Sequence, residues 1–153
     1  MYRIRRARAS ELERVQAIDR ELLDGSRPDY KYKSTVWWVA VVPGREITPG
    51  AADEIVGYAA GYLWAQDEER AFVMTRCGVV KEHRGRGLQH RLLRARIRHA
   101  RALGARAVWT YTHATNIKSS NNLIAEGFRL WKPNHWAGER VRGTAWLHWE
   151  RRL

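Results

Sequence analysis

The sequence contains a single cysteine, Cys77, and no apolar run approaches the length of about 18 residues that suggests a membrane-spanning helix. One cysteine excludes an internal disulfide and fits a reducing compartment. Cys and His residues do not occur at zinc-ligand spacing, so we expect no metal. No signal-like arrangement opens the chain, and we therefore expect a cytoplasmic protein without a membrane partner.

Acidic residues are also few. The chain has 16 Asp and Glu against 28 Lys and Arg, which gives a formal net charge of +12. Such a balance predicts a positive field that attracts anions. Arginines on solvated faces are one explanation, and an acidic partner such as RNA, DNA or an acidic protein is the other. Composition leaves both open.

Two familiar phosphate-binding motifs are missing as well. No Gly-x4-Gly-Lys-Ser/Thr run is present. The dinucleotide fingerprint G-x-G-x-x-G finds its first two glycines in Gly85 and Gly87, but its third position is His90.

What is present is a glycine-rich turn, Arg84-Gly85-Arg86-Gly87-Leu88-Gln89, between two regular segments. Residues 71–80 read as an apolar strand, and residues 88–103 have helical periodicity. A turn of this kind directs several backbone N–H groups at one point, where the helix dipole also favours negative charge. The segment therefore predicts a phosphate site, most simply for a pyrophosphate.

A second segment lies at a fitting distance. Asn116-Ile-Lys-Ser-Ser-Asn-Asn-Leu-Ile-Ala-Glu-Gly-Phe128 follows a strand-like run at residues 107–112. With the turn, it resembles the GCN5-related N-acetyltransferases, whose signature there is Asn-x-x-[Ala/Ser]-x3-Tyr-x3-Gly-Phe. Asn116, Ser119, Gly127 and Phe128 fit it, and Leu123 occupies the tyrosine position. The resemblance is sharp over residues 71–132 and general elsewhere.

The resemblance implies an α/β fold with a mixed, mostly antiparallel central sheet of about six to seven strands and about four flanking helices. It implies one domain over residues 1–153 and acetyl-CoA as co-substrate, without a metal. The family's loop holds the pyrophosphate of coenzyme A. Carried over residue by residue, the cofactor-binding set is Val79, Val80, Arg84, Gly85, Arg86, Gly87, Leu88, Gln89, His90, Asn116 and Ser119.

Catalysis in the family polarises the acetyl carbonyl with a backbone N–H, which corresponds to Val79 or Val80. The side-chain pattern departs from the family. Leu123 replaces the tyrosine that protonates the leaving thiolate in many relatives, and Val73 stands where some members have a glutamate. We take His113, just beyond the strand at residues 107–112, as the candidate base or proton relay. The alternatives are His135, Tyr111, Glu68 and ordered water.

The acceptor amine is open: a small amine or amino acid, a protein amino group, or an aminoacyl-tRNA. Tyr30 and Tyr32 follow a loop-like stretch at residues 24–29 and are candidate pocket walls, as is Trp136. Trp146 and Trp149 alternate along a final strand, and we expect them in the core.

The remaining patterns complete the expected sheet and helices. We expect strands at residues 2–6, 37–42, 55–65 and 144–149, and a helix that Ser10 caps. In the helix at 88–103, the apolar half of the circumference packs on the sheet, and Arg96 falls within it, so this side chain must snorkel or find a partner. The opposite half carries Arg91, Arg94, Arg98 and Arg101, which form a solvated face or track a phosphate backbone.

The sequence is therefore compatible with two functional classes. The first is an acetyl-CoA-dependent N-acetyltransferase that transfers directly to a primary amine. The second is a non-catalytic module on the same fold that binds an acyl-CoA or a nucleic acid. We expect a monomer or a homodimer.

Overall fold

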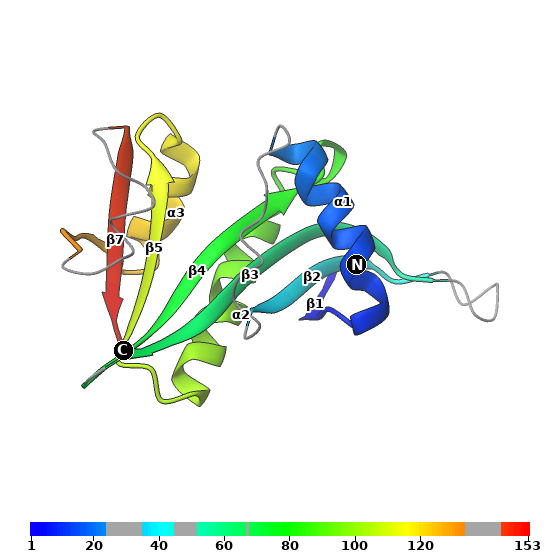
Figure 1. The fold of residues 1–153 in the computed structure, drawn as a ribbon. Helices are drawn as coiled ribbons and strands as arrows, with labels where there is room; N and C mark the ends of the chain where they lie inside the picture. Colours follow the sequence, from blue (N-terminus) through cyan, green and yellow to red (C-terminus); the bar gives the residue numbers. More distant parts are fainter. Residues whose placement is uncertain (24–34, 45–51, 67, 134–144) are drawn as a thin grey trace. The chain divides into compact units, whose positions relative to one another are not determined.

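The computed structural model describes residues 1–23, 35–44, 52–66, 68–133 and 145–153 (Figure 1). They belong to two compact units. The first comprises Met1–Tyr62 and Arg76–His99, and the second Leu63–Thr75 and Ala100–Leu153. Our expectation of one domain over residues 1–153 stays a prediction.

Seven strands pair in the order β1-β2-β3-β4-β5-β7-β6. The pairs β1–β2, β2–β3, β5–β7 and β6–β7 are antiparallel, and β4–β5 is parallel. The mixed, mostly antiparallel sheet predicted from the sequence is confirmed. The strands are β1 (Arg3–Arg6), β2 (Val36–Val42), β3 (Glu54–Gln66), β4 (Glu69–Val79), β5 (Ala107–His113), β6 (Arg129–Leu130) and β7 (Trp146–Arg152).

Three α-helices occur in the described part of the chain: α1 (Leu12–Leu22), α2 (Leu88–Ala102) and α3 (Ile117–Ala125). None of its helices is long and apolar enough to cross a membrane. Two short 3-10 turns, η1 (Ala9–Glu11) and η2 (Lys81–His83), precede α1 and α2. The predicted cap at Ser10 is wrong, because Ser10 lies inside η1. Glu11 closes that turn by accepting the backbone N–H of Arg8 at 2.8 Å.

The first unit has helices on both faces of its strands. Because side chains alternate along a strand, Trp37, Val39 and Val41 share one face of β2. They form a buried cluster with Val15 of α1, which crosses in front of β2 and β3 in Figure 1. On the other face, Trp38 meets His99 of α2 edge-on, with ring centroids 5.2 Å apart.

Two arginines, one half-buried and one buried, tie these helices to the strands of the first unit. Asp19 of α1 is fully buried and accepts two bonds from Arg76 of β4, at 3.0 and 2.7 Å. Arg96 of α2 donates to the carbonyl of Ala60 at 3.3 Å and lies against Cys77. Burial lowers the pKa of Arg96 and raises the pKa of Cys77. The predicted partner of Arg96 is therefore a main-chain carbonyl.

The second unit is built on the β5–β7 pair. Trp149 of β7 is buried, and its indole N–H donates to the Thr112 hydroxyl at 2.9 Å. The same hydroxyl lies 3.3 Å from that of Ser120, which places α3 on this face. The opposite face carries Trp109, which is buried and stacks on Trp131 at 4.8 Å.

Candidate functional site

The glycine turn joins β4 to α2 in the first unit. Gly85 and Gly87 have φ of +74° and +70°, where residues other than glycine are strained. A Cβ built on either glycine would meet nothing within 4 Å. The sequence therefore has glycine here for its backbone conformation, and the space beside both residues is open.

Helix α2 begins immediately after the turn. Arg91 N–H donates to the carbonyl of Gly87 at 3.1 Å, so Leu88, Gln89 and His90 form the first turn of the helix. Backbone N–H groups at this position have no acceptor within an α-helix. The first turn of α2 has no acidic residue. Main-chain amides and the positive end of the helix dipole thus favour an anion at this terminus.

Arginine and aromatic side chains hold the turn in place. Arg84 Nε donates to the carbonyl of Val79, the last residue of β4, at 2.9 Å. The Arg86 guanidinium lies 5.9 Å from the centre of the Tyr2 ring. The Tyr2 hydroxyl is 3.0 Å from Nδ1 of His83. These contacts fix the turn against the end of β4 and the start of the chain.

One of the two backbone amides predicted to polarise a carbonyl has a main-chain acceptor in the first unit. Val80 N–H donates to the carbonyl of Val56 in β3 at 2.9 Å. That amide is therefore committed inside the first unit. We therefore keep the Val79 N–H as the candidate that would polarise the carbonyl.

The Asn-headed segment lies in the second unit and forms both ends of α3. Asn116 caps the helix, because its Oδ1 accepts from Ser119 N–H at 3.2 Å. At the other end, Gly127 has φ of +80°, and Phe128 N–H bonds the carbonyl of Leu123 at 3.0 Å. This part of the motif is thus a helix with a cap at each terminus.

The two positions at which the sequence departs from the family pattern, Leu123 and Val73, carry side chains that cannot donate a proton. Leu123 is 5% exposed and belongs to the core of the second unit, as does Val73, which is 3% exposed. Both side chains are apolar. Any titratable group of this site must come from elsewhere in the chain.

His113 ends β5 and is exposed. Its Nδ1 accepts the backbone N–H of Thr115 at 3.3 Å and lies 2.7 Å from the Thr115 hydroxyl. In the neutral ring with Nδ1 as acceptor, Nε2 carries the hydrogen. His113 can then donate a hydrogen bond from Nε2.

An aromatic face surrounds His113 in the second unit. The β5–β7 register places His113 opposite Trp146 and Tyr111 opposite His148. Ring centroids are 5.3 Å apart for His113 and Trp146, and 5.7 Å for Tyr111 and Trp146. Trp146 is 36% exposed, so its predicted core position is wrong, whereas that of Trp149 is confirmed. The four residues Tyr111, His113, Trp146 and His148 are called the β5–β7 face below.

The predicted site residues fall into three groups. The turn and the end of β4 belong to the first unit, and His113, Asn116 and Ser119 to the second. Tyr30, Tyr32 and Trp136 lie outside the described residues. Among the residues that the structure describes, no cluster of three His, Cys, Asp or Glu side chains could hold a metal ion.

Sequence reasoning missed the Asp19–Arg76 pair and the role of Tyr111 and His148 as neighbours of His113. A signal existed for Asp19, which falls four residues after the buried Val15 on the apolar side of its helix. The β5–β7 face had only a weak signal, since strand register decides which residues stand opposite one another.

Comparison with known proteins gives relatives at the level of the fold. Curated proteins gave no match. Among solved structures, the chain is similar to Arabidopsis thaliana NAA60 in complex with acetyl-CoA, with 17% identity, a TM-score of 0.77 and 100% of both chains covered. It is also similar to the ribosomal-protein-S18-alanine N-acetyltransferase from Escherichia coli, with 12% identity, a TM-score of 0.74, and 100% of this chain and 94% of that one covered.

A third structure is the NatC complex bound to Gag peptide and CoA, with 17% identity, a TM-score of 0.73, and 99% and 98% of the two chains covered. At these identities the likeness shows the fold alone. The family comparison goes further, because the model of the acetyltransferase (GNAT) family matches residues 10–125. The match spans well over half of the sequence, and the chain belongs to the acetyltransferase (GNAT) family.

Proposed function

We propose that this protein is an acetyl-CoA-dependent N-acetyltransferase that moves an acetyl group directly onto the α-amino group of a peptide or protein. Membership of the acetyltransferase family supports the reaction class. The observation that carries the proposal is the pair of left-handed glycines, Gly85 and Gly87, with open space beside them at the start of α2.

The residues that would hold the pyrophosphate are those of the turn, from Arg84 to His90. Their fit rests on three features: backbone amides at a helix start, no acidic residue in that first helical turn, and open space beside both glycines. Asn116 and Ser119 keep their predicted places in the cofactor-binding set. When bound, acetyl-CoA supplies an acetyl group activated as a thioester. We assign the Val79 N–H to the acetyl carbonyl, since the Val80 N–H is donated to Val56.

The chain must also move protons, because an amine is mostly protonated at neutral pH. We assign His113 a place beside the leaving thiolate, to which Nε2–H donates a hydrogen bond while Thr115 holds Nδ1, and the proton that the thiolate finally takes comes from the amine or from water. This orientation argues against Nε2 as the base that deprotonates the amine. An unchanged pH–rate profile for acetyl transfer by His113→Ala would remove the assignment.

Neighbouring structures support a peptide acceptor. Arabidopsis thaliana NAA60 and Naa50 are found in complex with bisubstrate analogues, the latter CoA-Ac-MVNAL, and NatC with a peptide. In this chain the β5–β7 face offers exposed aromatic and imidazole groups that suit an amine and its flanking chain. A small amine and an aminoacyl-tRNA are the competing acceptors. We also place the protein in the cytoplasm, which its free thiol, Cys77, supports.

One observation favours a second function, a non-catalytic acyl-CoA-binding module. Leu123 and Val73 leave the family's two familiar side-chain positions without an ionisable group. Mass spectrometry of peptides, small amines and aminoacyl-tRNA incubated with acetyl-CoA separates the two functions. Acetylation of a peptide with release of thiol supports the enzyme. Binding of acetyl-CoA without turnover on any acceptor supports the module.

The cofactor site is tested by Gly87→Ala, with Gly104→Ala as its control. Gly104 also has φ of +70°, but it follows the end of α2. Each substitution strains a left-handed residue and costs about 1 kcal/mol of unfolding free energy. Only Gly87→Ala adds a Cβ to the proposed cradle, so we expect at least a tenfold weaker acetyl-CoA Kd for it alone, measured by calorimetry. Equal affinity of both variants, or no binding by the natural protein, would contradict the proposal.

A further inference from the structure

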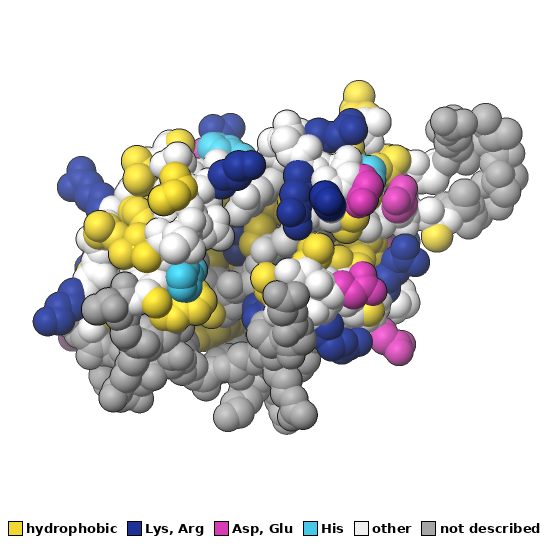
Figure 2. Space-filling view, turned by 90° about the horizontal axis from the view of Figure 1, so that it is seen from above, with side chains coloured by type: hydrophobic (Ala, Val, Ile, Leu, Met, Phe, Trp, Pro, Cys, Tyr) yellow, Lys and Arg dark blue, Asp and Glu magenta, His cyan; other side chains and the backbone are white. Residues whose placement is uncertain are grey.

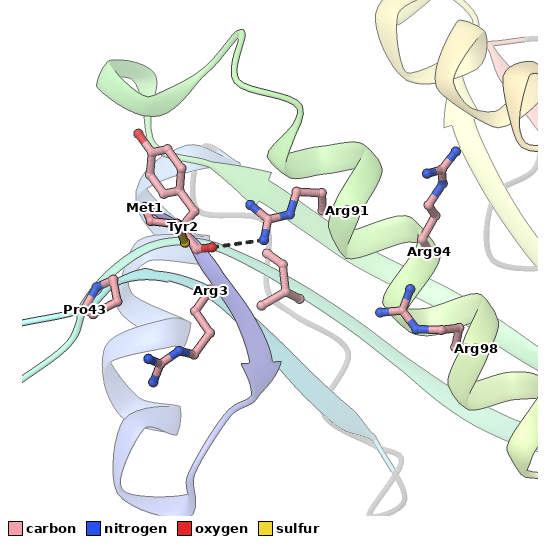
Figure 3. Close-up of a pocket in the computed structure, with 8 residues that line it drawn as sticks. Met1, Tyr2, Arg3, Pro43, Arg91, Arg94 and Arg98 are labelled. Atoms are coloured by element: carbon pink, nitrogen blue, oxygen red, sulfur yellow. Dashed lines mark hydrogen bonds between the residues drawn. The ribbon is translucent and has the colours of Figure 1, made fainter.

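Arg96 carries a buried charge on the inner side of α2. It is 5% exposed, whereas Arg91, Arg94 and Arg98 of the same helix are exposed. Figure 3 shows those three side chains extending away from the helix. Lys and Arg side chains are also spread over the surface seen in Figure 2. Water is the usual surrounding of a cation in this protein, so the burial of one guanidinium requires a reason.

The polar contacts of the Arg96 guanidinium are weak. Its Nη1 donates to the carbonyl of Ala60 at 3.3 Å, and its Nε donates to that of Leu92 at 3.4 Å. Both distances exceed the usual range of about 2.7–3.2 Å for such bonds. The third contact is the Cys77 thiol, whose pKa burial raises, so that it stays neutral. Among the residues that the structure describes, Arg96 therefore has no carboxylate to balance its charge.

Burial without a counter-charge is costly. On the opposite face of β4, Arg76 bonds both carboxylate oxygens of Asp19. A buried cation that lacks such a partner loses hydration that nothing replaces. One turn away from Arg96 on either side, Leu92 and Ala100 are fully buried, so an apolar side chain would suit the position between them. A charge kept where local packing favours an apolar group is typical of a functional site.

The direction of the Arg96 side chain relates it to the proposed acetyl-CoA site. Because its Nε bonds a carbonyl four residues earlier, the side chain extends toward the start of α2 and the glycine turn. It meets Cys77, which lies two residues before Val79 in β4. Side chains two positions apart share one face of a strand and are about 7 Å apart along it. The cation thus lies against the end of β4 whose Val79 N–H we assign to the acetyl carbonyl.

We infer that the buried guanidinium of Arg96 stabilises, through its electric field, the negative charge that acetyl transfer leaves on the sulfur of coenzyme A. The inference rests on the proposed function and deepens it. As the new carbon–nitrogen bond forms, the carbon–sulfur bond breaks and its electron pair goes to sulfur. The amine gives up its proton to the thiolate or to water. A cation fixed in place before the reaction favours this step.

Arg96 suits this role because its charge is permanent. A guanidinium stays protonated in a protein, so it supplies a field and no proton. Inside a protein the field of a charge is screened far less than in water, and it acts over several ångströms. The cation therefore compensates for a side chain that the family pattern has and this chain lacks, since Leu123 cannot protonate the leaving thiolate.

Titration of the thiol of bound coenzyme A tests the inference without an acceptor. The ultraviolet absorbance of the thiolate is followed against pH, and the complex with desulfo-coenzyme A is subtracted so that Cys77 cancels. The variants are Arg96→Met and Arg96→Gln, and the matched control is Arg98→Met, which removes the same charge from an exposed position of α2. We expect the acid dissociation constant of the bound thiol to fall at least about fivefold in both Arg96 variants. The control should stay within about twofold of the natural protein.

The pair of Arg96 variants separates charge from structure. Glutamine can still donate a hydrogen bond to a main-chain carbonyl and methionine cannot, so equal losses identify the charge as the cause. Coenzyme A should bind both variants within about threefold of the natural affinity at slightly acid pH, where its thiol is protonated, because a guanidinium that serves the sulfur does not hold the phosphates. The urea midpoint of Arg96→Met should be equal to or higher than that of the natural protein, since a buried charge is removed.

The inference is overturned if the bound thiol titrates alike in the natural protein and both Arg96 variants, if only Arg96→Met differs, or if Arg98→Met loses as much. It is also overturned if the Arg96 variants bind coenzyme A far more weakly while the thiol titration is unchanged, or if Arg96→Met has a lower urea midpoint. Each of these results leaves the proposed acetyl transfer standing. Failure of the natural protein to bind coenzyme A contradicts the inference and the proposed function together.

Discussion

The first unit uses arginine in two opposite ways. Arg5 and Arg76, which we call the inner arginines, have 18% and 17% of their side chains exposed; Arg5 bonds two carboxylates and Arg76 bonds that of Asp19. Arg91, Arg94 and Arg98 share one side of α2 and are exposed, and we call them the outer arginines. The first group joins strands to helices, and the second lies on the exposed side of α2. The same side chain thus stabilises the fold where a carboxylate is buried or half-buried beside it.

The difference has an energetic basis. A buried cation without its partner loses hydration that nothing replaces, whereas an exposed cation keeps its water. Substitutions that break the ion pairs of Arg5 and Arg76 should therefore lower the free energy of unfolding. Substitutions at the outer arginines should change it little.

The largest effect is expected for Asp19→Ala. Asp19 is fully buried, and Arg76 donates a hydrogen bond to each of its carboxylate oxygens. Removal leaves Arg76 mostly buried without its carboxylate and should lower the unfolding free energy by about 3 kcal/mol, near the lower end for broken buried pairs. Urea denaturation followed by tryptophan fluorescence measures the change.

A double substitution shows whether the loss comes from the stranded charge. In Asp19→Leu/Arg76→Met both charges are replaced by apolar groups, so stability should recover to within about 1 kcal/mol of the natural protein. If the double variant is as unstable as Asp19→Ala, shape and not charge explains the effect, and the comparison between inner and outer arginines fails.

A smaller, pH-dependent effect is expected at Glu11. Bonds from Arg5, and from the Arg8 backbone N–H, lower the pKa of Glu11 from 4.5 to about 2. Because the folded pKa lies below the unfolded one, this contribution is complete above pH 4.5 and is lost as the pH falls toward 2. Glu11→Gln should cost about 1 kcal/mol at pH 7. Denaturation at pH 7, 4.5 and 3 should show the gap to the natural protein closing with acid.

Glu21→Gln serves as the control for this experiment, since Glu21 is exposed near the end of α1. Its denaturation curves should follow those of the natural protein at each pH. A gap between Glu11→Gln and the natural protein that stays constant from pH 7 to pH 3 would show that the Arg5–Glu11 contact contributes no ionic stabilisation.

Much of the fold followed from the sequence because its signals are local. Gly85, Gly87 and Gly127 need positive φ, so their positions mark the turn before α2 and the end of α3. Arg96 stood on the apolar side of a helical wheel, and a partner could be expected. The identity of that partner, the Ala60 carbonyl, depends on how α2 packs against β3, which no local pattern encodes.

The chemistry of the β5–β7 face was harder to predict for the same reason. Alternation along the last strand placed Trp146 and Trp149 on opposite faces but did not say which face is covered. Packing of α3 decides this, because Ser120 and Thr112 lie together beneath Trp149. The tautomer of His113 likewise depends on a turn that brings the Thr115 N–H to its ring.

The smallest effects should appear at the outer arginines, and they differ in an informative way. Arg98→Gln should change the unfolding free energy by less than about 0.5 kcal/mol, as exposed substitutions usually do. Arg91→Gln removes the bond to the Tyr2 carbonyl and should cost slightly more, about 0.5–1 kcal/mol. Urea titrations of both variants measure the difference. A cost of 2 kcal/mol or more for Arg98→Gln, on the order of a buried group, would mean that the outer arginines also hold the fold together, and the distinction between the two groups would be lost.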